Sequence, residues 1–125
     1  MRPTILALSF LVGGLLGAAQ KFDVVVYGGT AGGVVTAVTA AREGASVALL
    51  EPGHHLGGMV SGGLGRTDQG RKEVVGGTSL EFFERVGRHY GRSVIWDFEP
   101  HVAEDTFKAM AGEAGVRVFY RHRLR

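Results

Sequence analysis

The sequence contains no cysteine and no marked excess of charge of either sign. Its 14 Lys and Arg residues against 12 Asp and Glu residues give a formal net charge of +2. Without cysteine no disulfide framework can form, and cysteine usage reports nothing about the redox compartment. The small net charge provides no argument for a nucleic-acid partner. The one marked excess is glycine, with 21 residues, so the positions of the glycines carry most of the information.

A hydrophobic run of membrane-spanning length is also lacking. The apolar stretch from Ile5 to Leu16 follows Arg2 and falls short of the ~20 residues that a spanning helix needs. The small residues Gly17–Ala19 come next, which completes the pattern of a secretory signal peptide over residues 1–19, cleaved after Ala19. We therefore expect an exported protein, periplasmic or extracellular, with no stable membrane anchor after cleavage. The alternative is an uncleaved membrane anchor.

Residues Phe22 to Glu51 carry the pattern of a strand, a glycine turn, a helix and a second strand. Val24 to Tyr27 form an unbroken, mostly β-branched apolar run, which is typical of a parallel strand buried on both faces. Small residues follow at helical spacing up to Gly44, which fits the left-handed end of a helix. Val47 to Leu50 predict a second buried strand. This order is the layout of a βαβ unit that binds a dinucleotide.

The glycine-rich turn after the first strand has the chemistry of a pyrophosphate site. Gly28 permits a tight turn, Gly33 lets the helix approach the strand, and the unpaired N–H groups of the first helical turn attract a pyrophosphate. Glu51 at the end of the second strand can accept hydrogen bonds from ribose hydroxyls. Thr30 occupies the middle position of G-x-G-x-x-G, so either Gly29 absorbs the strain or the Thr30 hydroxyl binds an oxygen itself. The alternative interpretation is an α/β protein with a glycine-rich turn and no ligand.

A long glycine-rich loop, Pro52 to Gly70, begins directly after Glu51. A loop of this length without structure of its own usually serves a function or is disordered. Its Gly57-Gly58 pair would let the backbone approach a flat ligand or a pyrophosphate closely. We therefore expect the beginning of this loop to belong to the ligand site.

The remaining sequence predicts two helices and a third strand. Thr78 and Glu81 resemble a capping box at the start of an amphipathic helix. Pro100 suits the first turn of the next helix, which Gly115 ends. Residues Val116 to Tyr120 predict a short strand.

These elements predict an α/β fold of the Rossmann type with a parallel sheet. In a doubly wound sheet of order 3-2-1-4-5 the first strand is central, and the sequence supplies strands for positions 1, 2 and 3 only. The strand Val24–Tyr27 would then expose a hydrogen-bonding edge to water, which natural proteins avoid. We therefore expect the sheet to be incomplete and the chain to be an N-terminal fragment of a larger protein.

Several sequence stretches resemble a known family. D-V-V-V-Y-G-G-T-A-G-G-V, A-A-R-E-G-A-S-V-A-L-L-E-P, H-L-G-G-M and F-E-P-H-V-A-E are similar to the N-terminal part of FAD-dependent oxidoreductases of the glutathione-reductase fold. The resemblance covers residues 22–120 and implies that residues 20–125 are the N-terminal part of an FAD-binding domain. The family commonly has Thr at the middle position of the turn. The implied cofactor-binding residues are Gly28, Gly29, Thr30, Ala31, Gly32, Gly33, Glu51, Pro52, Gly57, Gly58 and Met59.

By position, the resemblance implies that residues 28–33 hold the FAD pyrophosphate and that Glu51 binds the adenosine ribose. The loop from His54 to Met59 would run past the phosphates towards the flavin. The flavin carries the redox chemistry and the protein orients and tunes it. We therefore predict noncovalent FAD as cofactor and hydride transfer between a small organic substrate and the flavin, with catalytic residues that cannot be placed in this sequence. The alternatives are an NAD(P)-binding dehydrogenase, against which the H-L-G-G-M loop argues, and a nucleotide-binding module without catalysis.

Other chemistry-bearing residues receive a structural interpretation. We expect His54 and His55 to be ordinary loop histidines, neither metal ligands nor a covalent flavin link, and we expect no metal site. His101 and Glu104, three residues apart on a helix, are expected to be a solvated pair. Ser61 lacks the strand–G-x-S-x-G–helix context of a hydrolase nucleophile.

The aromatic and basic residues near the C-terminal end also have simple explanations. Trp96 precedes a predicted helix, where aromatic residues usually pack on the core. The arginines between positions 117 and 125 are expected to form a solvated strand end, because no aromatic platform or nucleic-acid motif accompanies them.

Overall fold

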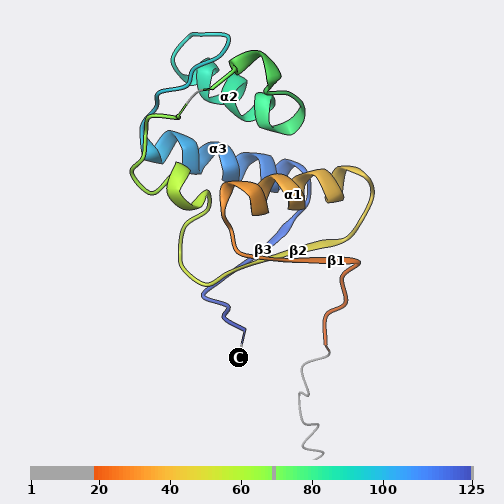
Figure 1. The fold of residues 1–125 in the computed structure, drawn as a ribbon. Coiled ribbons are helices and arrows are strands. Elements are labelled where there is room, and N and C mark those ends of the chain that lie inside the picture. The colour runs from red at the N-terminus through yellow and green to blue at the C-terminus, as the bar shows by residue number, and fades with distance from the viewer. Residues whose placement is uncertain (1–18, 69, 125) are drawn as a thin grey trace, which may run out of the picture.

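The computed structural model describes residues 19–68 and 70–124, which form three layers (Figure 1). A parallel sheet forms the first layer, two helices lie side by side on one of its faces, and a third helix lies above these two. No helix of the described residues is long and apolar enough to cross a membrane. The predicted leader, except for Ala19, lies outside the described residues. In chain order the elements are β1 (Val24–Tyr27), α1 (Ala31–Arg42), β2 (Val47–Glu51), the 3₁₀ turns η1 (Gly58–Val60) and η2 (Lys72–Val74), α2 (Gly77–His89), α3 (Pro100–Glu113) and β3 (Arg117–Tyr120).

The sheet has the order β1-β2-β3 and all its strands are parallel. Val25 pairs with Ala48, and Ala48 pairs in turn with Arg117. This confirms the predicted Rossmann-type α/β fold, because it is the arrangement of the first three strands in a doubly wound sheet. Within the described residues, the outer edge of β1 carries no further strand.

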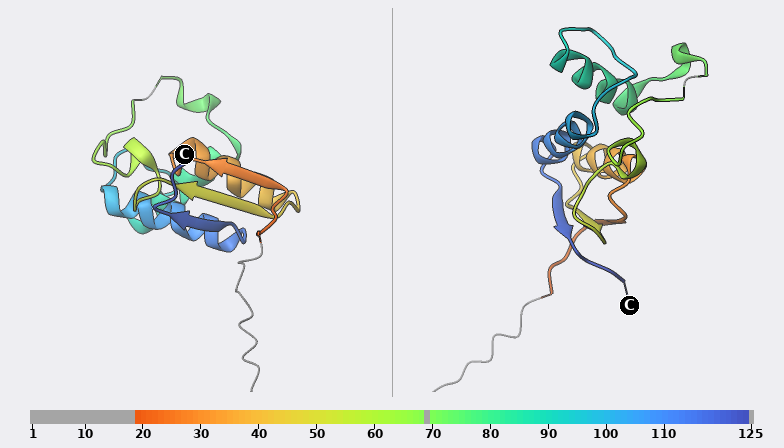
Figure 2. Two further views of the ribbon diagram at one scale, coloured as in Figure 1. Left: turned by 90° about the horizontal axis from the view of Figure 1, so that it is seen from below. Right: turned by 90° about the vertical axis from the view of Figure 1, so that its left-hand side faces the viewer.

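The helices cover only one face of this sheet. Val24 and Val26 of β1 pack against the core, whereas Val25 is 57% and Tyr27 is 48% exposed. The view from below in Figure 2 shows the strands in front of the helices. The prediction that β1 is buried on both faces is therefore wrong for the described residues, because an apolar run reports that a strand can be buried but not how many layers cover it.

Helix α1 connects β1 and β2, and its ends follow the sequence signals. Thr30 is the N-cap, and its hydroxyl oxygen accepts a hydrogen bond from the Gly33 N–H at 3.1 Å. Gly44 lies just beyond the C-terminal end with φ +96°, as predicted for a left-handed helix stop. The face towards the sheet consists of small or β-branched residues that are fully buried: Val34, Ala37 and Val38.

Helix α3 begins at Pro100, as predicted, and leads into β3. Gly115, with φ +75°, lies in the turn between them, and β3 starts at Arg117, one residue later than predicted. Phe107 and Met110 of α3 are fully buried at the centre of the core. The sequence therefore predicted the start of α3 correctly and the start of β3 to within one residue.

Helix α2 starts differently from the prediction. It begins at Gly77, and its N-cap Gly76 provides no side-chain cap. The Thr78 hydroxyl instead forms a hydrogen bond with the Thr39 hydroxyl of α1 at 3.2 Å. The predicted capping box is wrong because the side chains of Thr78 and Glu81 turn towards α1 rather than back to their own helix end.

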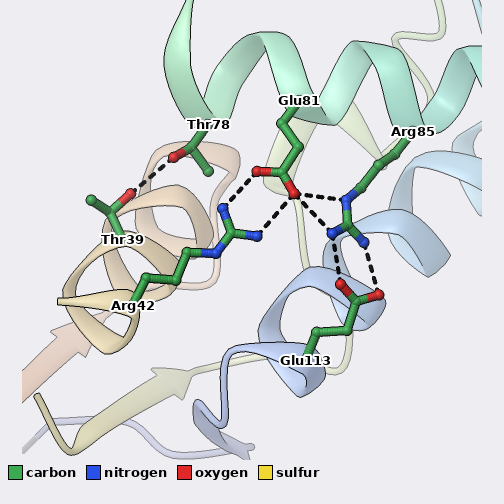
Figure 3. A network of polar contacts seen from close by, with 6 residues as sticks. All are labelled: Thr39, Arg42, Thr78, Glu81, Arg85 and Glu113. Carbon is green, nitrogen blue, oxygen red and sulfur yellow. Dashed lines mark hydrogen bonds and ion pairs between the residues drawn. The ribbon is translucent and has the colours of Figure 1, made fainter. Parts of the chain in front are cut away.

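Charged side chains join α2 to both helices of the middle layer (Figure 3). Arg42 of α1 donates two hydrogen bonds to the Glu81 carboxylate of α2, at 2.6 and 2.9 Å. Arg85 of α2 donates to Glu81 at 2.8 Å and to both carboxylate oxygens of Glu113 of α3, at 2.8 and 2.6 Å. The charges alternate in sign from Arg42 to Glu113, so each carboxylate is neutralised by a geometrically matched guanidinium.

The network changes the acid–base properties of its central carboxylate. Hydrogen bonds from Arg42, opposed by partial burial and reinforced by Arg85, lower the pKa of Glu81 to about 2. The Glu81 side chain is only 26% exposed, so its interactions are less screened than those of an exposed pair. The ionised form of Glu81 therefore stabilises the attachment of α2 to the rest of the fold.

We predict that Glu81→Gln lowers the free energy of unfolding by about 1–2 kcal/mol at neutral pH, because one neutral amide cannot satisfy two guanidinium groups. The folded-state pKa lies below the ordinary value of 4.5. The stability that Glu81 contributes is thus fully present above pH 4.5 and is lost as the pH falls towards 2. Urea unfolding at several pH values measures both effects, and the variant is expected to lose part of the acid-range pH dependence.

Glu84→Gln on the same helix is the matched control, because Glu84 takes part in no ion pair among the described residues. Equal unfolding free energies for the Glu81 and Glu84 variants would contradict a role for the network in stability.

Candidate functional site

The site is built where the three parallel strands end, because the carboxyl ends of parallel strands meet at one edge of the sheet. Glu51, the last residue of β2, lies at the centre of this edge. One of its carboxylate oxygens accepts the Gly29 N–H at 2.7 Å and the other accepts the Gly53 N–H at 2.5 Å. Its backbone carbonyl accepts the His122 N–H at 3.1 Å. Glu51 thus holds together the segments that follow β1, β2 and β3.

The hydrogen bonds of Glu51 leave room for a ligand. Each carboxylate oxygen has more than one acceptor position, so the same side chain can accept further hydrogen bonds from ribose hydroxyls. The predicted role of Glu51 at a ribose therefore remains compatible with its role in holding the two turns.

The turn after β1 brings backbone very close to backbone. Gly28 has φ +101°, and a Cβ built there would have no atom within 4 Å. A Cβ on Gly33 would overlap the Gly28 carbonyl oxygen, and a Cβ on Gly29 would lie 2.6 Å from Leu56 and 2.8 Å from Glu51. The turn therefore requires glycine for packing at Gly29 and Gly33, while open space lies beside Gly28 for a bound group.

Thr30 is explained by its position in this turn. Its hydroxyl oxygen is the N-cap acceptor of α1, so the side chain at the middle position satisfies one of the otherwise unpaired N–H groups at the helix end. The hydroxyl hydrogen remains available to donate to a phosphate oxygen. The N-terminus of a 12-residue helix adds the favourable dipole for an anion.

The segment after β2 supports this turn from behind. Leu56 is fully buried, and Gly57 donates its N–H to the Gly29 carbonyl at 2.7 Å. Gly57 and Gly58 both have positive φ, at +104° and +56°, and a Cβ on Gly57 would collide with Phe107 of α3. The prediction that this glycine pair permits a close backbone approach is consistent with the geometry, although Gly57 approaches protein atoms rather than open space.

A cleft of about 850 Å³ opens at this edge of the sheet, within the range of roughly 300–1,000 Å³ typical of small-molecule sites. Five of the predicted cofactor residues line it, namely Gly28, Thr30, Glu51, Pro52 and Gly58. The other six lie outside this lining. Two are buried behind it, namely Gly29 and Gly57. Three belong to the first turn of α1, namely Ala31, Gly32 and Gly33, and Met59 on η1 is 76% exposed.

Sequence reasoning missed one wall of the cleft. Pro100, His101 and Glu104 of α3 line it, together with His54 and His55. The expectation that Glu104 is solvated is wrong, because its side chain is only 14% exposed and contacts His55 at 3.1 Å, whereas His55 is an exposed loop histidine, as expected. No local signal connects residues so far apart in sequence; only the sheet order places the start of α3 beside the loop after β2.

A second cleft, of about 690 Å³, lies away from the strand ends. Trp96 forms part of it and packs on Phe83 with ring centroids 4.4 Å apart, while Lys72 Nζ lies 5.8 Å from the indole ring centroid. The packing on Phe83 agrees with the predicted structural role of Trp96.

Among the described residues, no group of three or more His, Cys, Asp or Glu is arranged to hold a metal ion.

Comparison with known proteins identifies the family. The family model described as FAD dependent oxidoreductase matches residues 23–125. The chain belongs to this family. The family resemblance seen in the sequence is thus confirmed, and with it FAD as the cofactor and the enzymatic character of the family.

One curated relative and several solved structures are similar to parts of the chain. The 3-oxosteroid 1-dehydrogenase of Mycolicibacterium smegmatis is 32% identical over 88 residues, which cover 70% of this chain and 16% of that protein. The chain therefore spans only a small part of the length of this relative.

Two solved structures share the fold at low sequence identity. THI4 of Thermovibrio ammonificans has a TM-score of 0.54 at 24% identity, with coverage of 79% of this chain and 38% of that one. The 3-ketosteroid-delta4-(5alpha)-dehydrogenase of Rhodococcus jostii RHA1, solved with 4-androstene-3,17-dione, has a TM-score of 0.53 at 17% identity, with coverage of 83% and 38%. These likenesses support the α/β fold of the chain.

The geometry of the turn predicts opposite outcomes for two neighbouring glycines. Gly33→Ala is expected to lower the free energy of unfolding by more than about 2 kcal/mol or to prevent folding, since its methyl group would overlap a backbone oxygen that cannot move away. Gly32→Ala is expected to leave stability unchanged or to raise it by up to ~1 kcal/mol, because its methyl group would meet only the Thr30 hydroxyl at 4.0 Å. Thermal and urea unfolding of both variants measure the difference, and equal stability of the two would contradict the close approach.

Proposed function

We propose that this chain forms the part of an FAD-dependent oxidoreductase that holds the adenosine diphosphate half of the cofactor, in an enzyme that transfers hydride between a small organic substrate and the flavin. The observation that carries the proposal is the convergence at one cleft of the α1 N-terminus, the Glu51 carboxylate and the glycine-rich loop after β2. Bound FAD would supply the hydride chemistry. The chain would supply binding and orientation.

Each group at the cleft has a role in this proposal. The N–H groups at the start of α1 and the Thr30 hydroxyl would bind the pyrophosphate oxygens. Glu51 would accept the ribose hydroxyls while it keeps the two turns together. Gly58 and the exposed Met59 would lead the loop along the cofactor towards the flavin. The residues that contact the substrate would lie outside this part of the chain.

The alternatives differ in what they expect at this site. An NAD(P)-binding dehydrogenase would use a similar turn and ribose carboxylate, but the match to the FAD-dependent family supports FAD. A nucleotide-binding module without catalysis would bind the cofactor and perform no turnover. Two similar proteins are named as ketosteroid dehydrogenases, so a 3-oxosteroid is a sensible first substrate to test with the complete enzyme.

The proposal predicts that the purified full-length protein shows the visible absorbance bands of flavin and releases FAD on denaturation. Added FAD at 100 times its Kd should stabilise the folded state by about 2.7 kcal/mol, while NAD should leave the unfolding temperature unchanged. Stabilisation by NAD without FAD would favour the dehydrogenase alternative. A colourless protein that responds to neither nucleotide would contradict the proposal.

We also propose that the protein is exported through the N-terminal leader, which is cleaved after Ala19. The support is the charged, apolar and small-residue order of residues 1–19. The mature protein isolated from its source is expected to begin at Gln20, as mass spectrometry of the intact protein would show. A mature chain that still begins at Met1 would contradict cleavage.

A further inference from the structure

The cofactor cleft contains an unusual set of charges for a pyrophosphate site. Among the described residues that line it, two are carboxylates, Glu51 and Glu104, and none is Lys or Arg. The residues there that can carry a positive charge are three histidines, His54, His55 and His101. Among the residues that line this cleft, only a protonated histidine could therefore provide a side-chain cation for an anionic dinucleotide.

The contacts of His54 and His101 make them poor candidates. The Arg121 Nε lies 3.3 and 3.2 Å from the two ring nitrogens of His54, so the His54 ring already faces a guanidinium cation. His101 follows Pro100 in the first turn of α3, where the helix dipole disfavours a positive charge.

His55 has the opposite environment. Its Nδ1 lies 3.1 and 3.2 Å from the two carboxylate oxygens of Glu104. Glu104 is only 14% exposed and also pairs with Lys108 Nζ at 2.8 Å. Burial raises the pKa of the Glu104 carboxyl, but the hydrogen bonds from Lys108 and His55 outweigh it, so that the pKa lies below its ordinary value. Glu104 is thus an ionised partner that can accept a hydrogen bond from the His55 ring.

His55 is also directly connected to the backbone that supports the phosphate turn. The next residue, Leu56, is fully buried against Gly29, and Gly57 donates its N–H to the Gly29 carbonyl. The contact between His55 and Glu104 of α3 therefore fixes the first residue of the segment 55–57, and the last two residues of this segment pack on the turn after β1.

We propose that His55, held by Glu104, is the titrating cation of the cofactor cleft, so that FAD binds more tightly when His55 is protonated. Glu104 is then a positioning residue that acts through His55. The inference rests on the proposed function only in that FAD occupies this cleft.

The other charged groups near His55 do not change over the same pH range. Hydrogen bonding to Glu104 raises the pKa of Lys108, and burial raises the pKa of Tyr120, so the first stays charged and the second neutral near pH 7. Glu51 of the cleft lining and Arg121 beside His54 are the other charged side chains at this end of the sheet. The pH dependence between about 5 and 8 is therefore expected from histidine alone.

The test is the Kd of FAD for the full-length protein, measured by flavin fluorescence between about pH 5 and 8. The wild type is expected to bind FAD about three to ten times more tightly at the acidic end than at the alkaline end, the range for one partly screened charge interaction. His55→Gln should flatten this profile. His55→Lys, which keeps its charge throughout, should bind tightly at both ends.

Glu104→Gln should remove part of the acid-range gain, and the double variant of His55 and Glu104 should behave like His55→Gln alone, because Glu104 acts through His55. His89→Gln and Asp105→Asn, both on exposed positions outside the cleft, are the matched controls and should keep the wild-type profile. Unfolding temperatures without FAD verify that each variant is folded.

A wild-type pH profile in His55→Gln, or additive effects of the two substitutions, would overturn the inference while FAD binding itself persists. Absence of FAD binding at every pH would instead overturn the proposed function, so the two failures are distinguishable.

Discussion

The hydrogen bonds of Glu51 are the constraint on which the site depends. A parallel sheet aligns the ends of its strands but does not connect the segments that leave them. Glu51 makes this connection: its two carboxylate oxygens accept N–H groups from the turn after β1 and from the segment after β2, and its carbonyl accepts an N–H from the segment after β3. The hydrogen bonds of Glu51 therefore fix the relative positions of the three segments that border the cleft. The side chain that the family resemblance assigns to the ribose is also the one that shapes the site.

The fold separates this site from the interactions that hold its layers together. The aromatic contact between Phe82 and Phe107, stacked at 4.2 Å, and the charged network of Figure 3 join α2 to the middle layer. The charged network lies on the helical side of the sheet, away from the cleft at the strand ends, whereas Phe107 also packs against Gly57 behind the cleft. Substitutions in the network are thus expected to act on stability and substitutions in the cleft on binding, which makes the two kinds of effect experimentally separable.

The sequence predicts the βαβ unit well because its signals are local. The apolar run of β1, the cap and stop of α1 and the proline of α3 each depend on neighbours within one element. The errors concern contacts between elements. Thr78 turns to Thr39 rather than capping its own helix, and His55 meets Glu104 across the cleft. The exposed face of β1 shows the same limit. Its residues alternate between buried and exposed because helices cover only one face of the sheet, and the apolar sequence of the strand does not reveal which faces are covered. The cofactor-binding roles of all the predicted residues stay predictions, both for those that line the cleft and for those that lie outside its lining.

The central claim is that the strand-end cleft holds the adenosine diphosphate half of FAD. The most direct measurement is a titration of the isotope-labelled protein with ADP, followed through the backbone amide chemical shifts. Saturable shifts are expected at three amides. The Gly29 N–H lies in the turn after β1, the Gly32 N–H lies in the first turn of α1, and the Gly53 N–H donates to the Glu51 carboxylate. Unchanged amides there, with shifts confined to the cleft beside Trp96, would contradict it.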